Sequence, residues 1–200
     1  GIISGNKIRG NAVDEHSSAN AIHLWYCKNL SIENNSVSHH RDGIYLEFTD
    51  SSEVRNNLSE HNLRYGLHFM FSNDDIYANN TFRQNGSGVA VMFSDHIDMV
   101  ENVFIENWGS AAYGLLLKEI YDSRLIGNEF VQNTIGIFAE GASRVEISRN
   151  VFRENGWGIK MRGSAMDNQI TKNNFSGNSF HVASDAKTNY NRYSENYWDN

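Results

Sequence analysis

The sequence predicts a right-handed parallel β-helix, an all-β solenoid of about nine coils with 22–26 residues each. Three observations predict it: an asparagine at a nearly fixed period, a second polar column five residues later, and a glycine followed by a short strand. Such self-similarity is typical of stacked repeats rather than of compact domains. We expect residues 1–200 to form one rod, excised from a longer chain.

The first column consists of asparagines that can stack one above the other in successive coils: Asn11, Asn35, Asn57, Asn80, Asn102, Asn128, Asn150, Asn173 and Asn196. Two residues later most coils have an apolar residue, from Val13 and Val37 to Phe175 and Trp198. The second column contains His16, His40, Asn62, Asn85, Asn107, Asn133, Asn155 and Asn178. Asparagine and glycine tolerate the left-handed backbone of sharp turns, which favours turns between short strands.

A strand with alternating residues follows each glycine, as in residues 44–46 and 67–69. Period 2 indicates strands rather than helices. The first and third residues after the glycine are apolar and should point inward, where stacked coils share one core.

The second and fourth residues after the glycine should form one outward face. These two columns read His23, Tyr45, His68, Ala90, Leu116, Phe138, Lys160 and Trp25, Glu47, Met70, Met92, Lys118, Glu140, Arg162. The middle of the face is apolar, and we expect six side chains to be exposed there: Trp25, Tyr45, Met70, Met92, Leu116 and Phe138. A contiguous apolar patch of this kind favours a docking surface, unless a loop or another part of the chain covers it.

His68, Met70 and Met92 lie close together in this pattern, since Met70 and Met92 share a column in neighbouring coils. Thioether and imidazole ligands suit soft Cu(I). We therefore expect a transient Cu(I) contact and no tightly bound cofactor. Methionine is also common on adaptable docking surfaces, which is the alternative.

One coil is longer than the others, so residues 108–113 should bulge from the rod. Insertions in solenoids often lie on the binding face. We expect Trp108 and Tyr113 to belong to the docking surface, together with Glu47 beside the apolar patch.

Composition excludes several other functions. The chain has 17 basic and 24 acidic residues, a net charge of −7, and no basic stripe for nucleic acid. Cys27 is the single cysteine, which excludes a disulfide framework. No apolar run approaches the ~18 residues that span a bilayer.

A carbohydrate-active enzyme is the alternative class, because lyases and epimerases also use β-helices. Such an enzyme needs acids, bases or arginines that converge in one groove. The candidates are a cluster of His39, His61, Arg41 and Asp42, and the Asp74–Asp75 pair. We interpret the first group as a stacked column of polar turn residues and the second as a solvated turn.

Residues 41–48, 59–72, 88–92 and 111–118 resemble the NosD family, and the similarity extends through essentially the whole segment. The resemblance implies a periplasmic, non-catalytic accessory protein for maturation of nitrous oxide reductase. It further implies partners: an ABC transporter with its ATPase and permease subunits, a copper chaperone, and the apo-reductase whose copper–sulfur centre is assembled.

Overall fold

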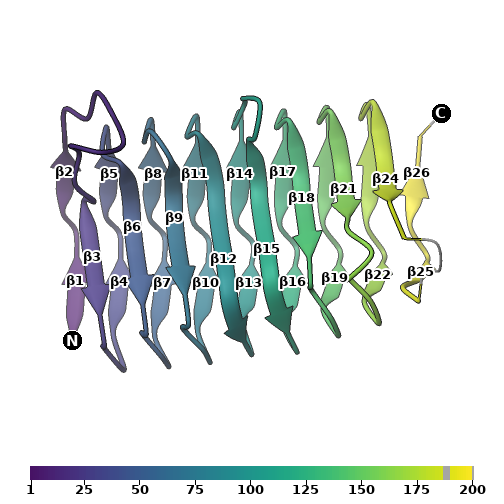
Figure 1. Cartoon of the computed structure of the whole chain (residues 1–200), viewed down its shortest axis with the longest axis horizontal. Coiled ribbons are helices and arrows are strands. Elements are labelled where there is room, and N and C mark those ends of the chain that lie inside the picture. The colour runs from purple at the N-terminus through teal and green to yellow at the C-terminus, as the bar shows by residue number, and fades with distance from the viewer. Residues whose placement is uncertain (187–189, 200) are drawn as a thin grey trace.

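The computed structural model describes residues 1–186 and 190–199, which wind into a straight rod of stacked coils (Figure 1). Each coil contributes short strands to three parallel sheets, and neighbours within a sheet come from adjacent coils. The described residues contain no helix. The predicted right-handed parallel β-helix is thereby confirmed.

Within the described residues, sheets A and B have nine strands each and sheet C has eight. Sheet A contains β1 (Ile2–Ser4), β4 (Ser31–Glu33), β7 (Glu53–Arg55), β10 (Ile76–Ala78), β13 (Asp98–Val100), β16 (Arg124–Ile126), β19 (Glu146–Ser148), β22 (Gln169–Thr171) and β25 (Arg192–Ser194). Sheet B contains β2 (Lys7–Arg9), β5 (Ser36–Ser38), β8 (Leu58–Glu60), β11 (Thr81–Arg83), β14 (Val103–Ile105), β17 (Glu129–Val131), β20 (Val151–Arg153), β23 (Asn174–Ser176) and β26 (Tyr197–Trp198). Sheet C contains β3 (Ile22–Trp25), β6 (Asp42–Glu47), β9 (Tyr65–Met70), β12 (Ser87–Asp95), β15 (Tyr113–Tyr121), β18 (Ile135–Glu140), β21 (Trp157–Met161) and β24 (Phe180–Ser184).

Buried asparagine amides join the coils at the turn between sheets A and B. The backbone N–H and the side-chain Nδ2 of Asn80 both donate to Oδ1 of Asn102, each at 3.0 Å. The second Nδ2 hydrogen of Asn80 reaches the carbonyl oxygen of Val54 in the preceding coil at 2.8 Å. Both side-chain groups are therefore satisfied inside the rod, which explains why an amide is required there.

The first coil differs from the expectation. The ladder begins at Asn6, whose Nδ2 donates to Oδ1 of Asn35 at 2.9 Å, and not at Asn11. Asn11, Val13 and His16 are exposed in a loop between β2 and β3, and Val13 is 85% exposed. This insertion places Asn11 at a normal repeat distance from Asn35 by coincidence, so assigning these three residues to ladder and core was wrong.

The core follows the predicted alternation. Inward side chains of all three sheets form one continuous cluster, and aromatic rings stack along sheet B. Phe104, Phe130 and Phe152 lie with ring centroids 4.6 and 4.8 Å apart and planes within 5°. One ring per coil thus fills the interior at the strand spacing.

The recurrent glycines at the second position of the sheet C strands are needed for close approach rather than for a left-handed turn. A Cβ on Gly66 would lie 2.7 Å from the carbonyl oxygen of Gly88 in the next coil. The left-handed positions are instead residues such as Asn34, Asn56 and Asn79, with φ between 55° and 56°. Each of these residues directly precedes a ladder asparagine.

Asn102→Ala should lower the free energy of unfolding by about 1–3 kcal/mol, because it leaves buried partners in the adjacent coils without a hydrogen bond. Urea denaturation measures this loss. Asn11→Ala is the matched control and should leave stability almost unchanged, since Asn11 is exposed in the loop. Equal losses in the two variants would contradict the assignment of the ladder.

Asp75 is a buried carboxyl group at the turn that precedes β10. Its Oδ1 accepts the backbone N–H of Ser52 at 2.7 Å, and its Oδ2 accepts the hydroxyl of Tyr77 at 3.0 Å. Burial raises the pKa of Asp75 to about 7, although both hydrogen bonds act in the opposite direction. Asn168 has the equivalent place before β22, where its Oδ1 accepts the N–H of Val145.

The stability of the rod should therefore depend on pH through Asp75. A folded-state pKa of about 7 against 3.8 means that the folded protein binds this proton more tightly. The contribution of Asp75 to the free energy of unfolding should be fully present below about pH 4 and fall by about 2–4 kcal/mol up to pH 7. Asp75→Asn should remove this part of the pH dependence, as measured by urea denaturation between pH 4 and 8. Asp74→Asn, at the exposed neighbour, should preserve it.

Candidate functional site

The outer face of sheet C carries the predicted site residues in the predicted register. Tyr45, His68, Ala90, Leu116 and Phe138 are direct neighbours across β6, β9, β12, β15 and β18. The residues between them, such as Leu67 and Phe69, belong to the main core. Strand alternation thus separates an inner face from an outer face, as expected.

Exposure on this face is uneven, which corrects the expectation that all six apolar side chains are exposed. Trp25 is 62% exposed, but Leu116 and Phe138 are only 8% exposed. Both pack with Ala90 in a small cluster outside the main core. Partly buried side chains pack against that cluster: Tyr65, Met92, Tyr113 and Ile135. The sequence pattern predicts the direction in which a side chain points, but it does not predict which neighbouring side chains cover it.

His68 is enclosed on this face by aromatic rings. It is 6% exposed, and its ring lies 4.8 Å from that of Tyr45 and 4.9 Å from that of Tyr65, centroid to centroid. Among the described residues, neither ring nitrogen has a hydrogen-bond partner. A buried imidazole without a hydrogen bond is costly, so its place in this cluster needs an explanation.

A buried ion pair supports the base of this cluster. The Asp42 carboxylate is fully buried and accepts hydrogen bonds from Nε and Nη2 of Arg64 at 2.9 and 2.6 Å. Nδ1 of His68 lies 3.8 Å from Oδ2 of Asp42. Burial alone would raise the pKa of Asp42, but the neighbouring His68 and Arg64 outweigh it and hold the pKa below its usual value. Asp42 is therefore a carboxylate, and Arg64 is committed to it.

Two thioethers lie beside His68. Met70 and Met92 are direct neighbours in β9 and β12, and both are half-buried. The Tyr45 hydroxyl donates to Sδ of Met70 at 3.5 Å. Glu47 pairs with Met70 from the adjacent coil in β6 and is also half-buried. The part of the chain that the structure describes has no cluster of three His, Cys, Asp or Glu side chains that could hold a metal ion.

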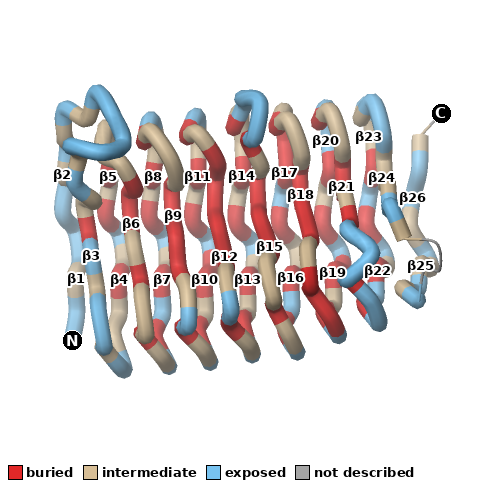
Figure 2. The backbone as a smooth tube through the Cα atoms, in the orientation of Figure 1, coloured by how far each residue is buried: buried red, intermediate tan, exposed pale blue. Residues whose placement is uncertain are grey.

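Two insertions flank a hollow of about 340 Å³ next to this cluster. One is the loop between β2 and β3, which contributes Glu15, and the other joins β14 to β15 and contributes Trp108. Both loops protrude from the same edge of the rod, where they are largely exposed (Figure 2). Arg64 and Tyr65 line the hollow between them. Trp108 is 56% exposed, whereas Tyr113 stacks on Phe138 at 5.1 Å.

A family model described as "Periplasmic copper-binding protein (NosD)" matches residues 4–200. The chain belongs to the NosD family. The family is periplasmic, and membership gives this chain a copper-related accessory role in general terms. No curated protein matches the chain. No helix among the described residues is long and apolar enough to cross a membrane.

Solved structures similar to this NosD-family chain include two epimerases and one phage protein. The A-modules of Azotobacter vinelandii mannuronan C-5 epimerases AlgE4 and AlgE6 have TM-scores of 0.72 and 0.71, with 18% and 17% identity. The match to AlgE4 covers 85% of this chain and 60% of the AlgE4 chain, and the match to AlgE6 covers 84% of this chain and 51% of the AlgE6 chain. The enzymatically active domain of bacteriophage CBA120 tailspike protein 2 has a TM-score of 0.73 at 12% identity, over 98% of this chain and 34% of that one. The likeness shows the fold alone.

The polar groups considered for an enzymatic groove do not converge. His39 and His61 lie at the turn with ring centroids 5.4 Å apart and planes tilted by 36°, as one column in adjacent coils. Asp42 turns inward to Arg64, and Nε of Arg41 lies 3.9 Å from its Oδ2, so the carboxylate is paired with arginines and not with the two histidines. Asp74 is exposed, and Asp75 is buried against Tyr77.

An exposed aromatic column at the end of the sheet C strands is the feature that the sequence reasoning missed. Tyr26, Phe48, Phe71 and Phe93 stack with centroid distances of 4.6, 5.1 and 5.2 Å and planes within 12°. We call these four residues the aromatic ladder. Their spacing of 22–23 residues, one position after the outward Trp25–Met92 column, was a visible signal.

Leu116→Asp should destabilise the rod, because a carboxylate would replace a covered apolar side chain. We expect the free energy of unfolding to fall by at least about 2 kcal/mol. Trp25→Asp is the control on the same face and should cost less, since Trp25 is largely exposed. Chemical denaturation of both variants measures the difference, and an equal loss would contradict the burial of Leu116.

Proposed function

We propose that this chain is a non-catalytic periplasmic accessory protein in assembly of the copper–sulfur centre of nitrous oxide reductase. In this proposal it works with an ABC transporter, through its ATPase and permease subunits, and with a copper chaperone that delivers copper for the apo-reductase. Family membership over residues 4–200 supports the copper-related part. The single observation that carries the site is a buried imidazole without a partner beside two neighbouring thioethers.

The copper contact would consist of His68, Met70 and Met92. Cu(I) is soft and prefers thioether and imidazole ligands to carboxylates. Among the described residues Nε2 of His68 has no hydrogen-bond partner, Nδ1 lies 3.8 Å from Oδ2 of Asp42, and Met70 and Met92 lie on the same outer face. Three ligands on an outer face suit a passing contact with copper as cargo, because a closed structural site would be fully coordinated. A partner would supply the remaining ligand.

The docking surface would surround this contact. Trp25 and Trp108 are its exposed aromatic side chains, and Tyr45 and Glu47 are half-buried in the coil next to His68. Leu116, Phe138 and Tyr113 support the face from beneath, because the first two are buried and Tyr113 stacks on Phe138. Exposed tryptophans of this kind are frequent anchors in protein interfaces.

A carbohydrate-active role is the second candidate, favoured by the buried Asp42 and His68 and the half-buried Arg64 next to the hollow. Arg64 argues against it, since its guanidinium already forms two hydrogen bonds with Asp42 and is not free for a sugar carboxylate. Incubation with alginate and pectate, followed by assay for unsaturated or epimerised product, separates the two candidates. Product formation that is lost in His68→Gln would favour the enzyme.

Met70→Leu/Met92→Leu should weaken Cu(I) binding by about tenfold or more, because the double variant removes both soft sulfur ligands and keeps their volume. Competition with a Cu(I) chelator measures the affinity, in the presence and in the absence of the copper chaperone.

The matched control is Met99→Leu/Met161→Leu, which removes two thioethers from the core, where both are 1% exposed. This control should bind Cu(I) as tightly as the unchanged chain. Equal Cu(I) affinity in all three proteins, alone and with the chaperone, would contradict the copper contact and leave only a docking role for this face. Capture of the chaperone or apo-reductase, with and without Cu(I), then tests the docking part separately.

A further inference from the structure

The aromatic ladder is not explained by the fold or by the proposed copper contact. Its four residues have left-handed backbones, with φ between 50° and 53°. Bulky aromatic side chains are uncommon there, and the other described left-handed positions outside the glycines carry polar or charged residues such as Asn, Asp, Glu and Arg. Tyr26, Phe71 and Phe93 are 66%, 39% and 40% exposed. A strip of stacked rings thus lies on the surface at positions where smaller residues would cost less.

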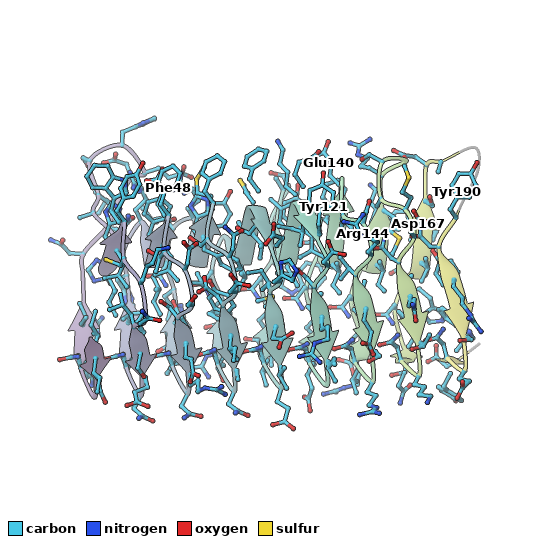
Figure 3. All side chains as sticks on the ribbon, turned by 90° about the horizontal axis from the view of Figure 1, so that it is seen from below. Phe48, Tyr121, Glu140, Arg144, Asp167 and Tyr190 are labelled. Carbon is cyan, nitrogen blue, oxygen red and sulfur yellow. The ribbon has the colours of Figure 1, made fainter. Side chains whose placement is uncertain are left out.

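The ladder ends at Phe93, because the equivalent position in the next coil is Glu119, beside the paired residues Met92 and Lys118. Glu119 does not cover the ring. Its carboxylate folds over Gly141 in the following coil, where an added Cβ would collide with it, and its Oε2 accepts the Tyr121 hydroxyl at 2.7 Å. Figure 3 views the rod from this edge and labels Phe48 and, farther along, Tyr121.

A hollow of about 480 Å³ lies where the fifth ring would be. Its lining residues are Phe93, Ser94, Asp95, Lys118, Glu119 and Tyr121. The Phe93 ring forms one side of the hollow, and Asp95 and Glu119 supply carboxylates to its lining. Within the described residues the Asp95 carboxylate has an ion pair with the exposed His96, and Glu119 has no cationic partner. The lining therefore combines an aromatic ring with negative charge.

We infer that this hollow binds an arginine side chain of a partner polypeptide, stacked on Phe93 and paired with Glu119. A guanidinium is planar and cationic, so it can continue the ladder over the ring and donate N–H groups to a carboxylate. An ammonium lacks the plane, and a neutral aromatic ring leaves the carboxylates unmatched. Apolar residues beside the arginine would lie along Phe71 and Phe48.

The charges around the hollow favour a basic partner segment. Asp74, Asp95 and Glu119 lie near the ladder end, and Arg144 is occupied by two hydrogen bonds with Asp122 at 2.6 and 2.7 Å. Lys118 is the single basic residue in the lining. Complementary charge of this kind selects the partner and its register more than it adds affinity. The inference is independent of copper, since no ladder residue belongs to the proposed contact.

Three peptides test the inference on the whole chain: acetyl-Leu-Arg-Leu-amide and its lysine and citrulline analogues. Citrulline keeps the plane without the charge, and lysine keeps the charge without the plane. The arginine peptide should bind about fivefold more tightly than either analogue, with NMR shifts centred on Phe93 and Lys118. Glu119→Gln and Phe93→Leu should each remove this preference.

Phe48→Leu is the matched control, because Phe48 lies inside the ladder with rings on both sides. It should retain the preference for arginine, and an unchanged folded spectrum verifies each variant. Absence of binding, equal binding of the three peptides, or a preference that survives in both Glu119→Gln and Phe93→Leu would overturn the inference. Binding of the citrulline peptide alone would overturn it in favour of a neutral planar ligand.

Discussion

The structure depends on the buried asparagine amides that join each coil to the next. An amide both donates and accepts hydrogen bonds. A column of amides therefore satisfies all of these groups only when every coil places its asparagine at the same position in the turn. Asn80 shows the arrangement, with two hydrogen bonds to Asn102 and one to Val54. This fixes the register of the adjacent strands, and strand alternation then determines which side chains point outward. The position of Met70 beside Met92 is a consequence of that register.

Much of the fold could be predicted because its constraints repeat. The period of the asparagines, the alternation after each glycine and the phenylalanines of sheet B are visible in the sequence, and the same register applies to each regular coil. The first coil could not be predicted, because the loop that holds Asn11 and Val13 breaks the period and a nearby asparagine imitates it. Repetition carries information only where the repeated residues can be assigned to their places in the coil.

For the candidate site, the sequence predicted which way the side chains point but not how deeply they are buried. Alternation placed Leu116 and Phe138 on the outer face, whereas their burial results from Tyr65 and Tyr113, which lie across them. The same limit applies to His68, whose enclosure by Tyr45 and Tyr65 follows from ring positions in adjacent coils. The burial of these side chains and the enclosure of His68 depend on rotamers and on a loop. Neither is encoded in the period of the sequence repeat. The same limit applies to the Asp42–Arg64 pair, because it joins two residues from adjacent coils.

The amide ladder also gives the rod a direction. Each Asn side chain turns its oxygen toward the preceding coil and donates toward the following one, as from Asn102 to Asn128 and from Asn150 to Asn173. The amide dipoles therefore add head to tail, as peptide dipoles do in an α-helix, and neighbouring hydrogen bonds polarise one another. The positive end of this sum faces the last coils. Electrostatically the two ends of the rod are not equivalent, and a charged molecule moving along its side would travel down a gradient.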